Sequence, residues 1–332
     1  MEKLFLLLFL LLSSALLWLG VTAKTAFAPG TEPPLRIAVS TSTLSAPIII
    51  AERMGFFRDQ QLAVQLIPQK GGDSCFNALM RDDADLATSS ESVAMFNSFK
   101  RNDFSIISTF AESDNDLKLL TRTASNIQHP TELLHHKIGI VAGSASEYFL
   151  DALLLMYGQQ QPAIQKVDIT ANDLTDALMA GVVDAISIWE PFAFHLQQQF
   201  PNQVQHFETK GLYNLTFNLL TRRADADKKL SQHVKLLKAL DEAILYIIKE
   251  PEKSQQLMAR YLKVPTEEIA ALWPDYLFRL SLGNTLLSSL QSQARWAMDA
   301  NLVHGSKIPD YRLYIEPTAL NQAIHTSLVR KE

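Results

Sequence analysis

Two hydrophobic periods alternate along the first two thirds of the chain. Apolar runs of strand length recur, each next to a stretch with helical spacing: Leu35–Val39, Leu62–Ile67, Ala84–Ala87, Phe104–Phe110, Lys137–Val141, Val167–Thr170 and Val204–Phe207. Strands and helices that alternate at this spacing predict βαβ units and a parallel sheet. From Asp225 onward the apolar positions follow the helical period, so we expect helices in the C-terminal third.

One pattern occurs twice, and its two copies align without a gap: Phe76–Phe96 and Thr175–His195. Each copy reads as a helix, a buried strand and the start of a second helix. The acidic residues that recur at matching positions are Asp85 with Asp184, and Glu91 with Glu190. Ligands of open α/β sheets bind beyond the carboxyl ends of the strands. The repeat therefore predicts two similar lobes whose strand ends face a shared space.

The second copy gives the most detailed expectation. Gly181 supplies the left-handed residue that ends a helix, and Val182–Trp189 is suited to a strand buried on both faces. Pro191 suits the first position of the helix that follows. Two further strands, Asp116–Arg122 and Leu215–Arg222, share the ending LLTR. We expect them to cross between the lobes and to act as a hinge.

The chain begins with an export signal. Lys3 precedes the apolar run Leu4–Val21, and the small residues Thr22 and Ala23 follow it, which is the order of a secretory signal peptide. The run is also close to the length of an uncleaved membrane anchor. In either case we expect a periplasmic location. The expected organisation is a signal peptide or anchor at 1–23, a linker at 24–34, lobe one at 35–115 and 222–332 with the C-terminal helices, and lobe two at 116–221 with the crossing strands.

Composition and motif content argue against several classes of function. The net charge of −5 argues against a nucleic-acid partner. Cys75 is the only cysteine, which excludes an intramolecular disulfide and a thiolate metal cluster. The sequence contains no GxSxG, HExxH, P-loop or GxGxxG motif, and no convincing histidine pair with metal-ligand spacing. We therefore expect no catalytic residue, no metal and no cofactor.

Four turns rich in Ser, Thr or Asp come directly before predicted helices: Ser40–Ser45, Asp73–Ser74, Ser89–Ser92 and Ser144–Glu147. Helix starts expose unpaired backbone N–H groups and a partial positive charge, so they attract anions. Together the turns favour a site for a sulfonate, carboxylate or nitrate. Ser, Thr and Asp are also ordinary helix N-caps, so each turn by itself has a structural interpretation as well.

Three residues indicate a different ligand chemistry. Glu91 and Glu190 offer carboxylates to an amine or a ring nitrogen, and Trp189 offers a surface on which a ring can stack. A carboxylate in the first turn of a helix is also favoured by the helix dipole alone. Tyr148 is a further candidate for covering the apolar part of a ligand. The residues by themselves therefore leave the charge of the ligand open.

The sequence resembles the nitrate/sulfonate/taurine-type solute-binding proteins of ABC importers, a group similar to binding proteins for thiamine-pyrimidine precursors. The resemblance begins at Leu35 and extends to the C-terminus. It is carried by LRIAV, APIIIAERMGFFRDQQLAVQLI, ALMRDDADLAT, KIGIVAGSASEYFL and ALMAGVVDAISIWEPF. It implies the α/β type II periplasmic-binding-protein fold, in which two lobes joined by two crossing strands close on a small molecule. One branch of the relatives synthesises a pyrimidine with a Cys-rich motif, which this chain lacks.

The resemblance also implies the residues that face the ligand. In the turns these are Thr41, Ser42, Thr43, Ser89, Ser90, Glu91, Gly143, Ser144, Ser146, Trp189 and Glu190. Asp116 and Asn214 are expected near the mouth of the cleft.

The function expected from the sequence is capture of a small organic solute, with a sulfonate-, taurine- or nitrate-like anion favoured. The expected partners are this small molecule and the membrane permease of an ABC importer, and the chain is expected to be a monomer. The alternatives are binding of a thiamine-pyrimidine or other heteroaromatic or amine precursor, a ligand-sensing role in a membrane signalling system, and a precursor-processing enzyme on the same scaffold.

Overall fold

The computed structural model describes residues 33–158, 164–305 and 307–329. Leu35–Glu332 forms one compact unit. The expected export signal and most of the expected linker lie outside the described residues. In the part of the chain that is described, no helix combines the length and the apolar character that crossing a bilayer requires.

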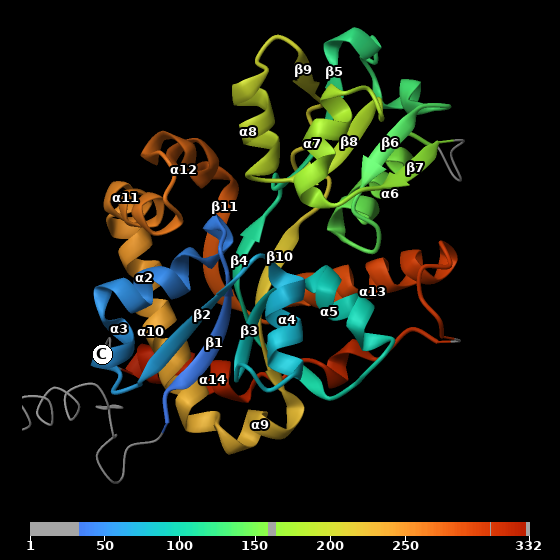
Figure 1. Ribbon diagram of the computed structural model, residues 1–332. Helices are drawn as coiled ribbons and strands as arrows, with labels where there is room; N and C mark the ends of the chain where they lie inside the picture. Colours follow the sequence, from blue (N-terminus) through green and yellow to red (C-terminus); the bar gives the residue numbers. More distant parts are fainter. Residues whose placement is uncertain (1–32, 159–163, 306, 330–332) are drawn as a thin grey trace, which may run out of the picture. The chain divides into compact units, whose positions relative to one another are not determined.

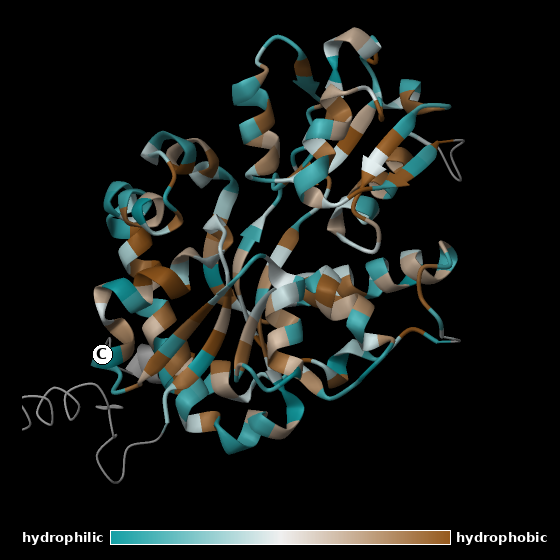
Figure 2. Ribbon diagram, in the orientation of Figure 1, coloured by the Kyte–Doolittle hydropathy of each residue, from teal (hydrophilic) through white to brown (hydrophobic). Residues whose placement is uncertain are grey.

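The first lobe is built on a six-stranded sheet with the order β11-β4-β10-β3-β1-β2 (Figure 1). Its strands are β1 (Leu35–Ser40), β2 (Val64–Gln69), β3 (Leu86–Ser90), β4 (Phe104–Ser113), β10 (Leu215–Arg222) and β11 (Tyr276–Ser281). β1 pairs in parallel with β2 and β3, whereas β10 runs antiparallel between β3 and β4. Hydrophobic residues are concentrated in β1, β2 and β10 (Figure 2), and most residues of β1 and β10 are buried, whereas the edge strand β2 is only partly covered.

The second lobe is built on a five-stranded sheet with the order β7-β6-β8-β5-β9. Its strands are β5 (Leu117–Arg122), β6 (Lys137–Ile140), β7 (Gln165–Asp168), β8 (Ala185–Trp189) and β9 (Val204–His206). β6 pairs in parallel with β7 and β8, and β5 runs antiparallel to β8 and β9. The chain leaves the first sheet after Ser113, enters the second at Leu117, and returns between His206 and Leu215.

Helices fill the remaining volume of each lobe. Those that connect the strands are α2 (Ala46–Met54), α3 (Phe56–Asp59), α4 (Gly72–Met80), α5 (Glu91–Ser98), α6 (Ala145–Met156), α7 (Ala171–Met179) and α8 (Phe192–Gln199). Those after β10 are α9 (Arg223–Lys228), α10 (Leu230–Lys249), α11 (Pro251–Leu262), α12 (Thr266–Leu272), α13 (Asn284–Asp299) and α14 (Thr318–Val329). Short 3-10 turns lie at Thr43–Ser45, Thr123–Ser125, Pro130–Leu133, Trp273–Asp275 and Tyr311–Leu313.

The helices after β10 pack mainly on the first lobe, as expected. The long helix α10 contacts α2, α3 and α14, and α13 contacts α5. The side chains of α10 that recur at helical spacing, Leu236, Leu237, Leu240, Ile244 and Ile247, are all buried. This apolar stripe ties the C-terminal third of the chain to the first core.

Several local expectations were wrong. The sheets are mixed rather than parallel, because the crossing strands β5 and β10 insert antiparallel to their neighbours. β11 is a strand within the region expected to be helical. β11 is an edge strand whose apolar Leu277 is 51% exposed. The pattern of apolar residues in this segment therefore does not distinguish a strand from a helix. β8 begins at Ala185 rather than Val182, because the backbone N–H groups of Val182 and Val183 donate to the carbonyl of Ala177 and close α7. Pro191 is the N-cap of α8 rather than its first residue.

The internal repeat is confirmed as α4–β3–α5 and α7–β8–α8. In both copies the recurring aspartate ties the start of its strand to the neighbouring parallel strand, β1 in the first sheet and β6 in the second. Asp85 accepts a hydrogen bond from the backbone N–H of Arg36 at 2.9 Å, and Asp184 accepts one from the backbone N–H of Lys137 at 3.0 Å. The two lobes therefore share a local design as well as an order of elements.

Candidate ligand-binding site

The candidate residues lie where the strands of both sheets reach their carboxyl ends. Thr41–Thr43 follows β1, Ser89–Glu91 ends β3, Gly143–Ser146 follows β6, and Trp189–Glu190 ends β8. The crossing strands run beside two of these turns, since Phe217 of β10 is paired with Ser90 and Leu117 of β5 with Trp189. This is the edge at which open α/β sheets bind ligands.

The turn after β1 is partly occupied by its own hydrogen bonds. The backbone N–H and the hydroxyl of Thr41 both donate to the carbonyl of Gln69, at 3.0 and 3.1 Å. Thr43 is buried. Ser42 is half-buried and precedes a 3-10 turn without forming a side-chain cap. Of the three candidates, Ser42 therefore has the hydroxyl that is least committed to the fold.

The turn after β3 contains two serines with different surroundings. Ser89 is fully buried, and its hydroxyl has no hydrogen-bond partner among the described residues. It lies against Gly72, where a Cβ atom would come within 2.7 Å of Ser89 Oγ. Ser90 is half-buried and is the N-cap of α5, but its hydroxyl forms no cap hydrogen bond. Ser90 can therefore donate to or accept from a solute.

Glu91 is fully buried and its carboxylate is already occupied. Its Oε1 accepts hydrogen bonds from the Tyr213 hydroxyl and, at 2.9 Å, from Gln293 Nε2. Its Oε2 accepts from the backbone N–H and the hydroxyl of Thr216, at 2.8 and 3.0 Å. Burial raises the pKa of Glu91, and the hydrogen bonds from Tyr213 and Thr216 oppose that shift. In this conformation Glu91 positions Tyr213 and has no atom exposed to a solute.

The turn after β6 uses its hydroxyls to build the start of α6. The Ser144 hydroxyl donates to the carbonyl of Val141 at 2.6 Å and accepts from the backbone N–H of Ser146 at 3.1 Å. The Ser146 hydroxyl is buried and donates to the carbonyl of Ser187 at 2.7 Å. Gly143 has a φ of +66° and its N–H donates to Glu147 Oε2 at 3.0 Å. The N-cap interpretation therefore accounts for Ser144 in full.

Asp116 and Glu190 form a buried pair of carboxyl groups. Asp116 is 3% exposed and Glu190 is 7% exposed, and the backbone N–H of Glu190 donates to the Asp116 carbonyl at 3.0 Å. The Tyr276 hydroxyl donates to Asp116 Oδ1 at 3.0 Å, and the backbone N–H of Phe194 donates to Glu190 Oε2 at 2.8 Å. The two acids come from the first crossing connection and the end of β8, and the tyrosine comes from β11 of the other lobe.

Burial is the main reason why the pKa values of both carboxyl groups are raised. It raises the pKa of Asp116 to about 7, against the hydrogen bond from Tyr276. It likewise raises the pKa of Glu190 to about 7, with a further increase from the charge of Asp116. The charge of Lys118 lowers both pKa values, while its ammonium group donates to the carbonyl of Asn115 at 2.6 Å.

The remaining two candidates differ in availability. Trp189 is half-buried, with its ring packed edge-on against Phe192 at a centroid distance of 6.3 Å. Asn214 is half-buried and donates from Nδ2 to Glu112 Oε2 at 3.2 Å. The Glu112 carboxylate also forms an ion pair with Arg279 at 2.8 Å. Trp189 therefore keeps exposed ring surface, whereas the Asn214 amide is engaged with Glu112.

An aromatic group that the sequence did not indicate joins the two lobes. The Tyr148 ring of α6 packs edge-on against Tyr213 at 5.5 Å and against Trp296 of α13 at 5.1 Å. Trp296 Nε1 also donates to Asp151 of α6 at 2.8 Å. The sequence offered Tyr148 alone as a candidate, because contacts of residues so far apart in the chain depend on how α13 lies against α6.

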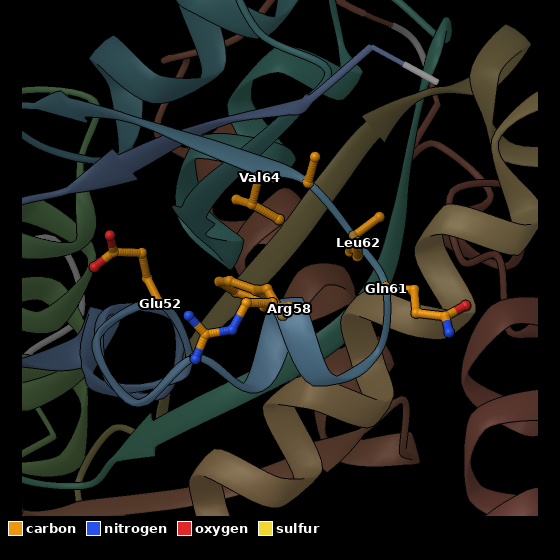
Figure 3. A pocket seen from close by; sticks show the side chains of 8 residues that line it. Glu52, Arg58, Gln61, Leu62 and Val64 are labelled. Carbon is orange, nitrogen blue, oxygen red and sulfur yellow. The ribbon is translucent and has the colours of Figure 1, made fainter. Parts of the chain in front are cut away.

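A surface pocket lies apart from these residues (Figure 3). Its walls include Glu52 of α2, Arg58 of α3, Gln61 and Leu62 of the loop after α3, and Val64 at the start of β2. It adjoins the amino end of β2, which is the edge of the sheet opposite the candidate site. Among the described residues, no group of three or more His, Cys, Asp or Glu side chains is placed to hold a metal ion.

Comparison with known proteins yields both a family and a fold. A family model described as "NMT1/THI5 like" matches residues 42–254, which is more than half of the chain. A curated relative, the putative aliphatic sulfonates-binding protein of Bacillus subtilis (strain 168), is 24% identical over 217 residues. The match covers 64% of this chain and 64% of that relative, slightly less than two thirds of its length.

Two solved structures have the same fold. The periplasmic aliphatic sulphonate binding protein SsuA from Escherichia coli gives a TM-score of 0.76 at 22% identity, with 86% of this chain and 93% of that chain covered. The periplasmic nitrate-binding protein NrtA from Synechocystis PCC 6803 gives a TM-score of 0.68 at 12% identity, with 88% of each chain covered. The two lobes thus form the periplasmic-binding-protein fold expected from the sequence.

Proposed function

The chain belongs to the NMT1/THI5-like family, and on that premise we propose that it is the extracytoplasmic solute-binding protein of an ABC importer. It binds a small organic solute between its lobes and presents it to a membrane permease. The names of the relatives support a sulfonate- or nitrate-type solute. The periplasmic location of those relatives supports a periplasmic location for this chain, in line with the export signal expected from its sequence.

The observation that carries this proposal is the gathering of side chains from both sheets at their strand carboxyl ends. Trp189 and Glu190 come from the second sheet, Ser90 from the first, and Asp116 from the connection between them. Tyr276 of the first sheet donates to Asp116. A solute held by such a set contacts both lobes at once, and it therefore selects the closed arrangement of the lobes.

We propose that the lobes have the ranges given by the sequence, 35–115 with 222–332 and 116–221. Support comes from the two places where the chain passes between the sheets, before Leu117 and before Leu215. The range 116–221 counts most of β10 with lobe two because it is the returning crossing, although β10 pairs with β3 and β4 of the first sheet. Two connections of this kind restrict the lobes to opening and closing about one axis.

No chemical step is part of the proposal. The groups at the strand ends either complete the fold, as Ser144 and Glu91 do, or offer polar and aromatic contacts to a solute, as Ser90, Glu190 and Trp189 do. A single chain supplies all of them, so the site is complete in a monomer.

A thermal-shift panel of sulfonates, nitrate, pyrimidines and amines tests the proposal. A solute present at 100 times its dissociation constant adds about 2.7 kcal/mol to the free energy of unfolding, which raises the melting temperature by a few degrees or more. Trp189→Ala and Glu190→Ala should abolish the shift. The matched control is Ile248→Ala on α10, whose side chain is 67% exposed and lies outside the site.

Two outcomes contradict the proposal. Absence of a shift with every compound of the panel at millimolar concentration argues against a solute-binding role. Conversion of a bound compound to a product would assign the chain to the enzymes that share this scaffold instead.

A further inference from the structure

Two C-terminal helices that pack with the first lobe also reach the second lobe. Helix α13 contacts α6 through Trp296, and α12 contacts α8 through Glu268. Neither Trp296 nor Glu268 is among the candidate residues of the solute site, and both contacts join one protein side chain to another. We propose that the two contacts form a latch between the lobes, which holds them closed before a solute binds.

Trp296 is anchored on the first lobe and bonded to the second. Its ring packs edge-on against Phe96 of α5 at a centroid distance of 6.0 Å, and against Tyr148 of α6 at 5.1 Å. Its Nε1 donates to Asp151 Oδ2 of α6 at 2.8 Å. Lys166 of β7 donates to the same oxygen at 2.7 Å and holds that carboxylate in place. The indole therefore makes a charge-assisted hydrogen bond between the lobes, which is stronger than a neutral one.

Glu268 makes the second contact, from the first turn of α12. Its side chain is buried, and its Oε2 lies 3.0 Å from His195 Nε2 of α8. The His195 side chain is 52% exposed, so water competes for this contact. It is therefore the weaker of the two bridges.

The two bridges lie on different sides of the strands that cross between the lobes. Figure 1 shows α8 and α12 to the left of β4 and β10, and α6 and α13 to their right. The crossing connections are themselves tied to the first lobe, because Asn115 Nδ2 and Lys210 Nζ both donate to the carboxylate of Asp275, at 2.8 and 3.1 Å. These two bonds fix the base of the hinge, whereas the Trp296 and Glu268 contacts join elements that a rotation of the lobes separates.

Such a latch lowers the cost of closing the lobes. A solute that binds only the closed arrangement gains apparent affinity in proportion to the closed fraction. Trp296 and Glu268 are thus positioning residues, because they act on the lobes and not on the solute. Their loss weakens the binding of every solute by one factor and leaves the preference between solutes unchanged.

Single-molecule energy transfer between dyes on the two lobes tests the latch without a solute. Cysteines replace the exposed Asp176 of α7 and Glu252 of α11, while the native Cys75 is buried and stays unlabelled. The protein is dialysed in urea and refolded, which removes compounds carried over from the cell. The wild type should spend most of its time in the state with the shorter distance between the dyes.

Substitution of the two latch residues should open the lobes to different degrees. Trp296→Phe keeps an aromatic ring and removes the N–H, so the ratio of closed to open molecules should fall about tenfold. Glu268→Ala should lower it about threefold, and Glu268→Gln, which can still bond to His195, should lower it less. The two effects should multiply in Trp296→Phe/Glu268→Ala, because the contacts share no residue.

Matched controls separate the latch from a general loss of packing. Trp273→Phe alters an aromatic contact within the first lobe, with Phe278 at 5.2 Å, and Glu267→Ala removes the exposed acid next to Glu268. Both should keep the wild-type ratio. A wild type that is mostly open, an unchanged ratio in Trp296→Phe, or an equal fall in Trp273→Phe overturns the latch. The thermal-shift panel decides separately whether a solute binds, so the proposed function stands or falls independently.

Discussion

The turns that end β3 and β8 occupy the same place in the two lobes, yet their glutamates do different things. Glu91 receives hydrogen bonds from Tyr213, Thr216 and Gln293 and has no exposed surface. Glu190 receives one from the backbone of its own helix, through Phe194. The carboxylate of Glu91 is thus saturated by the fold, whereas that of Glu190 receives a single hydrogen bond from it.

The difference arises from the elements that follow the repeat in the chain. Tyr213 and Thr216 belong to the return connection and β10, and Gln293 belongs to α13. These elements pack on the first lobe, so they cover its turn and leave the turn of the second lobe to Asp116. Equivalent residues of the repeat therefore have the same backbone position but different side-chain roles, because different elements pack over them.

Removal of Glu91 should have the largest effect. Glu91→Ala leaves the buried N–H of Thr216, the Tyr213 hydroxyl and the Gln293 amide without their acceptor, and each such group costs about 1–3 kcal/mol. The free energy of unfolding, measured with urea, should fall by about 3–5 kcal/mol. Glu190→Ala should lower it by about 1 kcal/mol or less. Equal losses of unfolding free energy in Glu91→Ala and Glu190→Ala would contradict the view that only Glu91 is held by several hydrogen bonds of the fold.

The ligand-free protein should lose stability between about pH 4.5 and pH 7. The folded pKa values of Asp116 and Glu190, about 7, lie above those of the unfolded chain. In this window the folded state holds protons that the unfolded state has released, so stability falls as pH rises.

The variant Asp116→Asn/Glu190→Gln checks this dependence. Urea unfolding at pH 5, 6 and 7 should give a smaller loss for the double variant than for the wild type. A loss of the same size in both would assign the dependence to other groups, of which Glu91 is the first to consider because burial also raises its pKa.

The two recurring aspartates directly precede β3 and β8, at the amino ends of the strands and opposite the candidate site. Asp85 forms ion pairs with Arg36 at 3.0 Å and with Lys229 at 2.6 Å. Asp184 accepts from the backbone N–H of Lys137, lies 3.2 Å from His136 Nδ1 and is more exposed. Burial acts to raise the pKa of Asp85, yet the bonds from Arg36 and Lys229 outweigh it and hold the pKa well below its ordinary value. The ion pairs therefore stabilise the fold at neutral pH, and that contribution is lost as pH falls below about 4.

Substitution of both aspartates measures this difference between the lobes. Asp85→Asn should lower the free energy of unfolding at pH 7 by about 2–3 kcal/mol, and Asp184→Asn by about 1 kcal/mol. The gap between the variants should narrow in urea titrations at pH 3 to 4. Equal losses of unfolding free energy in the two variants at pH 7 would mean that the ion pairs of Asp85 with Lys229 and Arg36 add no stability beyond the backbone hydrogen bond that both aspartates form.

The sequence predicted the parts of this comparison that depend on local pattern. The two copies of the repeat, the strand ends and the turns were all visible in the spacing of apolar residues. The roles of Glu91 and Glu190 were not, since they depend on Tyr213, Gln293 and Tyr276, which lie from 86 to more than 200 residues away from the acids they contact or adjoin. β11 was missed for a related reason, because its pairing with β4 is set by the sheet and its own apolar residues are partly exposed.

The smallest expected effects concern the serines at two helix starts. Ser144 accepts a hydrogen bond from the backbone N–H of Ser146, so Ser144→Ala should lower the free energy of unfolding by about 1 kcal/mol. Ser90 forms no such bond, and Ser90→Ala should change it by less than about 0.5 kcal/mol. Binding should show the reverse order, with a weaker solute affinity in Ser90→Ala and little change in Ser144→Ala. Urea unfolding and calorimetry on the same two proteins decide the matter, because a hydroxyl that leaves stability unchanged and lowers affinity acts on the solute and not on the helix.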